Sequence, residues 1–160
     1  LISTAAGVFR YVPPTTPQGA WDVTCLLVQP TSDIVATDFD GDGKLEILTF
    51  SKFHGDTLAI WHEGQTRDRY EQVWCDSQKR SFLHALWAAD LNGEKCAVIG
   101  NRKDGRDLLL VRYVDGEYTV DVIDHDLGPA NCMVYRHDGS DYIVAAYRET
   151  DQLALYKVVE

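Results

Sequence analysis

The sequence predicts an all-β fold, and two observations lead to that prediction. Short apolar runs alternate with polar turns along the 160 residues, and no sustained helical period of apolar residues appears. One unit also recurs: an apolar strand, a polar turn with one basic residue, then a second apolar strand. The second strands begin at Leu58, Leu108 and Leu153, which lie 50 and 45 residues apart.

A period of roughly 45–50 residues with four strands is typical of a β-propeller blade. The sequence therefore predicts blades of four antiparallel strands, about three and a half of them in this chain. Because propellers typically close with about four to eight blades, we expect a partial ring or a part of a larger propeller. Other propeller segments or a second copy of the chain would then close the ring.

The chain is interpreted as a single β-propeller segment, 1–160, with four subdivisions. These are a partial blade at 1–29, a blade with an acidic loop at 30–78, a blade at 79–125 and a partial blade at 126–160. The chain begins with Leu1 and its one methionine is Met133, so we interpret it as a fragment or a processed product.

The acidic loop 38–46 reads D-x-D-x-D-G-x-x-E and lies between the apolar segments 33–37 and 47–50. Carboxylates at alternate positions converge if the backbone curls at Gly43, and such hard oxygen ligands suit Ca²⁺. Both flanks are predicted strands, which excludes the helix–loop–helix of an EF-hand. The alternative is an acidic β-turn that binds no metal, since Asp and Gly are also common turn residues.

Two later segments have weaker versions of this loop. The segment 88–93 keeps Asp90 and Asn92 but lacks the third and the distal acid, and the segment 135–139 has Arg136 in place of the first acid. We therefore expect one complete calcium site.

Segment 34–50, a strand, the acidic loop and an apolar strand, resembles the FG-GAP or VCBS repeat of integrin-like propellers. The resemblance is moderate over 83–113 and weak over 131–158. It implies Ca²⁺ held in the loop by Asp38, Asp40, Asp42, the backbone carbonyl of Lys44, and Glu46. The family includes adhesion heads, lectins, polysaccharide lyases and sugar dehydratase-like enzymes, so the scaffold does not fix the function.

A second candidate site is a basic face. Lys52, Arg102 and Arg148 occupy the same place in successive turns, 50 and 46 residues apart. We expect His54, Asn101 and Tyr147 near them, with His84 and Asn131 at the starts of first strands. Such a face could bind an anionic sugar such as a uronate, because Arg matches a carboxylate; the alternative is a set of solvated turn residues.

The sequence thus predicts a calcium-stabilised module that binds carbohydrate, such as an acidic polysaccharide, or a protein partner. The alternative is an enzyme, a polysaccharide lyase or sugar dehydratase, that uses the basic face with His84 as its base; a His beside a strand can equally be only hydrogen-bonded. Calcium sites of this kind suit extracellular concentrations, so we expect an extracellular, cell-surface or periplasmic location.

Composition limits the partners further. The net charge of −10 disfavours nucleic acid, and no apolar run reaches the ~20 residues of a membrane span. We interpret 62–69 as a solvated loop and the four tryptophans as packing between blades. No C-x-x-C motif occurs, and buried free thiols or disulfides are both open for Cys25, Cys75, Cys96 and Cys132.

Overall fold

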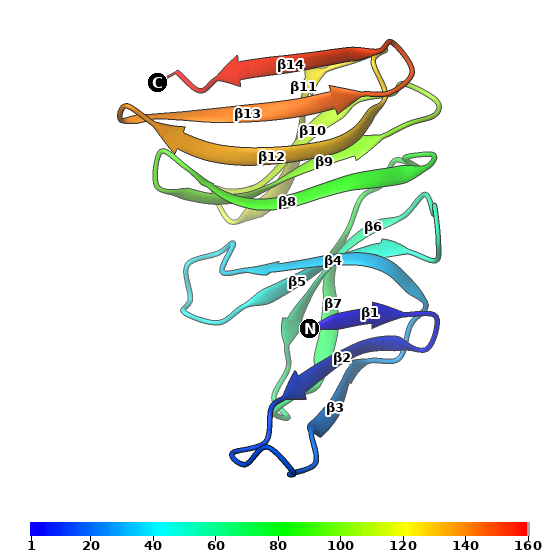
Figure 1. Ribbon diagram of the computed structural model, residues 1–160, viewed down its shortest axis with the longest axis vertical. Helices are drawn as coiled ribbons and strands as arrows, with labels where there is room; N and C mark the ends of the chain where they lie inside the picture. Colours follow the sequence, from blue (N-terminus) through cyan, green and yellow to red (C-terminus); the bar gives the residue numbers. More distant parts are fainter. Residues whose placement is uncertain (160) are drawn as a thin grey trace.

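A computed structural model describes residues 1–159, which form fourteen β-strands and no helix (Figure 1). The all-β class is therefore confirmed. The strands form four antiparallel sheets, and within each sheet every strand pairs with its neighbours in sequence. None of the described residues forms a helix that is long and apolar enough to cross a membrane.

The two sheets of the N-terminal half comprise seven strands. The first sheet contains β1 (Ile2–Thr4), β2 (Gly7–Val12) and β3 (Asp22–Leu27). The second contains β4 (Thr31–Thr37), β5 (Glu46–Ser51), β6 (Leu58–Glu63) and β7 (Tyr70–Cys75).

The C-terminal half forms two further sheets, the first with four strands and the second with three. The third sheet contains β8 (Leu83–Leu91), β9 (Glu94–Asn101), β10 (Leu108–Val114) and β11 (Glu117–Asp124). The fourth contains β12 (Pro129–His137), β13 (Ser140–Tyr147) and β14 (Gln152–Lys157).

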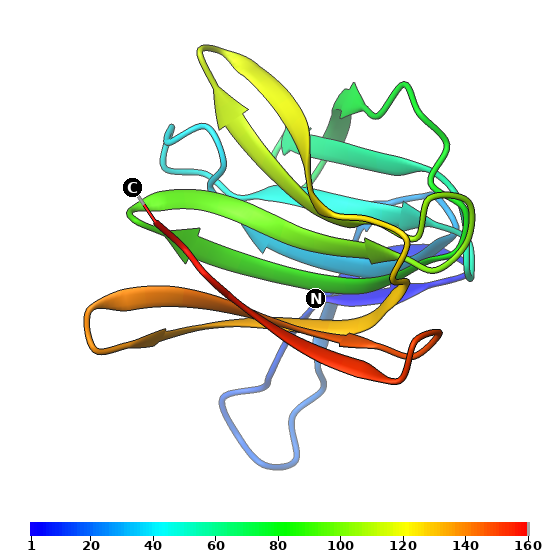
Figure 2. The same cartoon turned by 90° about the horizontal axis from the view of Figure 1, so that it is seen from above.

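The sheets follow one another in chain order, and one sheet falls within each of the segments 1–29, 30–78, 79–125 and 126–160. Their first strands are neighbours, since β1 contacts β4, β4 contacts β8 and β8 contacts β12. Within the described residues the sheets do not close into a ring (Figures 1 and 2).

The first strands of three sheets share a β-bulge near their start. The residue left out of the ladder is Ser32 in β4, His84 in β8 and Ala130 in β12. A bulge bends its strand and re-aims one side chain. The His84 imidazole lies on the next bulge, with Nδ1 2.9 Å from the carbonyl oxygen of Ala130.

Two-residue turns close several hairpins. Asn92-Gly93 joins β8 to β9 and Asp138-Gly139 joins β12 to β13, and all four residues have positive φ. These are the residue types that a type I′ turn requires. The equivalent connection from β4 to β5 is instead the loop 38–45, so among these three connections this one has room for the acidic residues.

The core lies between neighbouring sheets. Ile47 and Leu48 of β5 point to opposite faces, Ile47 toward the first sheet and Leu48 toward the third. In the same way Ile99 of β9 packs toward the second sheet and Val98 toward the fourth. Both faces of these strands are buried, which explains their continuous apolar sequence.

Some of the cysteines and tryptophans are less buried than the sequence predicts. The described residues contain no disulfide, and burial raises the pKa of the Cys96 and Cys132 thiols to about 12. Cys25 is half-buried, however, and Cys75 is exposed. Packing between sheets does not cover Trp21 or Trp87, which are 57% and 41% exposed.

Candidate metal centre and ligand-binding face

The acidic loop curls around its own backbone amides. Asp40 Oδ1 accepts a hydrogen bond from the Asp42 amide at 3.1 Å, and Asp42 Oδ1 accepts one from the Lys44 amide at 2.8 Å. The Lys44 amide lowers the pKa of Asp42. Gly43, at φ +87°, donates its amide to Asp38 Oδ2 at 3.1 Å. Glycine adopts this left-handed conformation without strain, and the carboxylates are drawn to one side of the loop.

Glu46 opens β5 directly after the loop and is completely buried. Its Oε2 accepts a hydrogen bond from the Phe39 amide at 2.6 Å, but its Oε1 is buried with no hydrogen-bond partner. Burial raises the pKa of Glu46 and outweighs the opposing effect of the Phe39 amide. A buried carboxylate oxygen without a partner is costly, and a cation at this position would relieve that cost.

His62 of β6 completes the cluster. Its Nδ1 lies 2.8 Å from the carbonyl oxygen of Glu63, and a carbonyl only accepts, so Nδ1 carries the proton. In the neutral ring Nε2 is then a bare acceptor, 3.1 Å from Asp42 Oδ2 and 3.6 Å from Glu46 Oε1. Burial lowers the pKa of His62, but the Glu63 carbonyl and the two carboxylates raise it overall.

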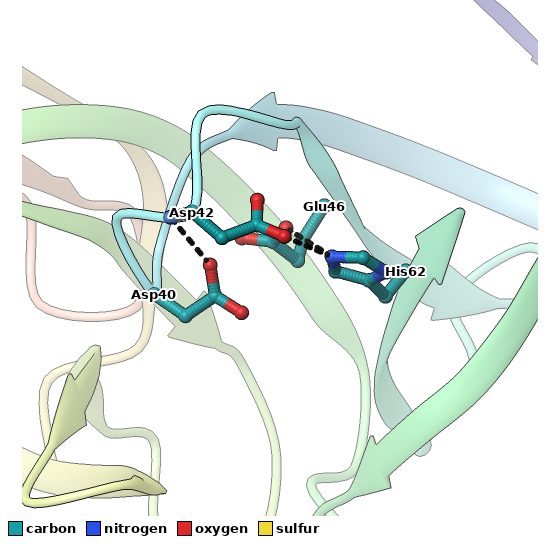
Figure 3. A group of neighbouring side chains, drawn as sticks. All are labelled: Asp40, Asp42, Glu46 and His62. Carbon is teal, nitrogen blue, oxygen red and sulfur yellow. Dashed lines mark hydrogen bonds and ion pairs between the residues drawn. The ribbon is translucent and has the colours of Figure 1, made fainter. Parts of the chain in front are cut away.

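Asp40, Asp42, Glu46 and His62 each offer one ligand atom, and these atoms lie within 4.8 Å of one another (Figure 3). The four side chains can therefore hold a metal ion. Carboxylate oxygens are typical of Ca²⁺, Mg²⁺ and Mn²⁺ sites, whereas imidazole nitrogen is typical of Zn²⁺ and other transition metals. The donor set defines a metal site without selecting the metal.

The cluster differs from the five ligands that the sequence predicts. Three of them, Asp40, Asp42 and Glu46, belong to it. Asp38 lies outside it, although its Oδ1 is also buried without a hydrogen-bond partner. Lys44 contacts the cluster through its amide, which donates to Asp42.

The interpretation of 62–69 as a solvated loop leaves His62 out of the predicted site. That interpretation is wrong for its first two residues, which belong to β6. The pairing of β5 with β6 is the feature that could have placed His62 in the site. Leu48 pairs with Ile60 and Ile47 with Trp61, so the next residues outward, Glu46 and His62, come opposite each other.

The structure brings only part of the predicted basic face together. Lys52 and His54 line an open cavity of about 620 Å³ with Phe53, Phe82 and Lys103. Arg102 lies beside it, with its Cζ 5.0 Å from the Phe82 ring centroid, but its side chain forms an ion pair with Glu149.

The other predicted members do not reach this cavity. Asn101 is fully buried, where its side chain binds the backbone of its own turn, donating to the Lys103 carbonyl at 2.6 Å and accepting from the Asp107 amide at 3.0 Å. Tyr147 is buried and bonds to the Tyr156 hydroxyl. Arg148 and Asn131 are exposed, but neither lines the cavity.

Aromatic rings dominate this surface. The His54 ring lies 3.8 Å from the Phe53 centroid and 3.9 Å from that of Phe82, and Phe82 is parallel to His84 within 6°. His54 and Phe82 both have positive φ, which is uncommon for such side chains and often occurs at functional sites. Phe53 is 79% exposed. We name this surface, comprising Lys52, Phe53, His54, Phe82 and Lys103, the aromatic–basic groove.

The comparisons with known proteins add no assignment: no protein-family model matches the chain, and no curated protein is significantly similar to it. The functional argument therefore depends on the metal cluster and on the aromatic–basic groove.

Proposed function

We propose that the chain is a calcium-stabilised segment of a β-propeller that binds an acidic carbohydrate at the aromatic–basic groove. The observation that carries this proposal is the combination of an exposed Phe53 with two lysines on one open cavity. Aromatic rings pack against the apolar face of a sugar, and lysine ammonium groups attract a uronate carboxylate. Among residues 1–159 neither Lys52 nor Lys103 forms an ion pair, and Asp56, which also lines the cavity, is paired with Lys79.

Calcium has a structural role in this proposal. It would be held by Asp40, Asp42, Glu46 and His62, with Asp38 and the Lys44 carbonyl as the further ligands that the family resemblance implies. The unpartnered Oε1 of Glu46 supports the metal, and three carboxylates support calcium over softer metals. Sites of this class are filled at extracellular calcium concentrations, which favours an extracellular, cell-surface or periplasmic location.

Three observations support the propeller arrangement. The first strands of successive sheets contact one another, and three of them repeat the same bulge. Both terminal sheets also have an exposed apolar face. Met133, Val144 and Leu155 form one cross-strand row on the fourth sheet, and Tyr11 pairs with Val23 on the first. Such faces mark interaction surfaces, and further blades or a second copy would cover them.

The test is a binding screen of acidic and neutral polysaccharides in calcium buffer. We expect an acidic polymer to bind, with Phe53→Ser and Lys103→Gln each weakening it about tenfold. The first variant removes an aromatic ring contact and the second a hydrogen bond from a charged group, and each is expected to contribute on the order of 1–2 kcal/mol. Trp21→Ser, which removes an exposed aromatic ring elsewhere, is the matched control.

Equal binding by wild type and both groove variants would contradict the proposed site. Assaying the same mixtures for new unsaturated or dehydrated products tests the enzymatic alternative, in which His84 is the base. If products form and His84→Ala abolishes them, the proposed binding function would be wrong and a lyase or dehydratase activity would take its place.

A further inference from the structure

The metal cluster borders a second cavity, separate from the aromatic–basic groove. This open cavity of about 580 Å³ lies between the second and third sheets. Asp40, His62 of β6 and Trp74 of β7 line it from the second sheet, and Tyr113 of β10 and Tyr118 of β11 line it from the third. Two of the four side chains that can hold the metal therefore face a space large enough for a small molecule.

The aromatic side chains form a continuous wall around Tyr118. Its ring centroid lies 4.8 Å from that of Tyr113, 6.0 Å from Trp74 and 6.1 Å from Phe39. A tyrosine hydroxyl carries its proton at neutral pH, so Tyr118 can donate a hydrogen bond to a molecule in the cavity that it lines.

The cluster does not complete the shell of a calcium ion. Counted at one ligand atom for each side chain, it offers four, whereas Ca²⁺ takes about six to eight. Asp38 and the Lys44 carbonyl would bring the count from four to six. A calcium shell of seven or eight ligands would then still have room for oxygens of a bound molecule. Because Asp40 and His62 line the cavity, that is the side from which a ligand would reach the ion. The buried, unpartnered Oε1 of Glu46 independently indicates that a cation belongs at this point.

We propose that this cavity binds a neutral sugar, whose vicinal hydroxyl groups coordinate the metal while its ring packs against Trp74 and Tyr118. This inference rests on the calcium site proposed above. Charge excludes an acidic sugar here: Asp40, Asp42 and Glu46 outweigh one divalent cation, and Glu117 adds a further carboxylate to the lining. The two cavities would thus bind different classes of sugar, with acidic sugars at the aromatic–basic groove and neutral sugars at the metal.

The experiment titrates mannose, galactose, glucose and glucuronate into the calcium-loaded chain, followed by tryptophan fluorescence and calorimetry. A parallel titration uses chelator-treated protein at a temperature at which it is still folded. We expect at least one neutral hexose to bind with calcium, to lose at least tenfold in affinity without it, and to bind more tightly than glucuronate.

Variants locate the site. Trp74→Leu should weaken the neutral sugar roughly fivefold through the lost ring contact, while Trp87→Leu, on the first strand of the third sheet, should leave it unchanged. Tyr118→Phe keeps the ring and removes only the hydroxyl, and it tests the same cavity if Trp74→Leu fails to fold.

A direct calcium titration separates the possible failures. Calcium binding without any neutral-sugar binding would overturn this inference and leave the proposed function intact. Sugar binding that survives chelation, or that Trp74→Leu and Tyr118→Phe leave unchanged, would overturn it as well. No calcium binding at all would overturn both the inference and the calcium part of the proposed function.

Discussion

Replacing Glu46 with glutamine is expected to have opposite effects with and without calcium. The wild-type carboxylate is completely buried, and Oε1 has no hydrogen-bond partner. Without metal, Glu46→Gln removes a buried charge and keeps a side chain of nearly the same shape. We therefore expect the free energy of unfolding to rise by about 1–3 kcal/mol. With calcium, the wild type gains ~2.7 kcal/mol at a hundredfold excess over Kd, and the variant loses most of that gain.

Urea unfolding followed by tryptophan fluorescence measures both effects, once in chelator and once in saturating calcium. Glu94→Gln is the matched control, because that carboxylate is largely exposed and lies outside the cluster. A destabilisation of Glu46→Gln by the same amount in both buffers would refute the reasoning, because it would mean that the carboxylate stabilises the fold by itself.

Three further predictions concern the scaffold. Leu48→Ala should cost about 2–5 kcal/mol in urea unfolding, because this side chain is fully buried, whereas Leu45→Ala, at a half-exposed position, should cost far less; equal costs would contradict the packing. Gly93→Ala should cost roughly 1–2 kcal/mol from its φ of +90° alone, since nothing crowds the added methyl group; an unchanged melting temperature would contradict the turn. The hydrogen bond from Arg102 lowers the pKa of Glu149 below 4.5, so their coupling in a double-mutant cycle, ~0.5–1 kcal/mol, should be present above pH 4.5 and disappear as the pH falls through the lowered folded-state value; coupling that persists in acid would contradict the pair.

The sequence predicts the sheets well because their signals are local. Asn92-Gly93 and Asp138-Gly139 mark hairpins by turn chemistry alone. The continuous apolar run of β9 marks a strand buried on both faces, and the recurrence of such units gives the order of the sheets.

The candidate sites are harder to predict because they join residues from different hairpins. Asp40, Asp42 and Glu46 are close in sequence, so the loop motif predicts them, whereas His62 joins the cluster through the pairing of β5 with β6. Similarly, the spacing of Asn101 in the repeat gives its position in the turn but not its burial, which depends on the hydrogen bonds that the turn backbone needs.

The aromatic–basic groove shows the same limit. Phe53 and Phe82 are 29 positions apart and meet at His54 because the β5–β6 connection lies beside the residues that precede β8, where the Leu83 amide donates to the Gly55 carbonyl at 3.1 Å. No pattern within either segment predicts that contact, since it depends on how two sheets pack.

The most direct test of the metal site is the melting temperature of the wild-type chain as calcium is added after chelation. The account predicts a saturable rise of roughly 5–10 °C at a hundredfold excess over Kd. The rise should be absent in Asp40→Asn, which removes one carboxylate of the cluster. A melting temperature that stays constant from chelator to saturating calcium, in wild type and variant alike, would contradict the central claim that a bound cation stabilises this fold.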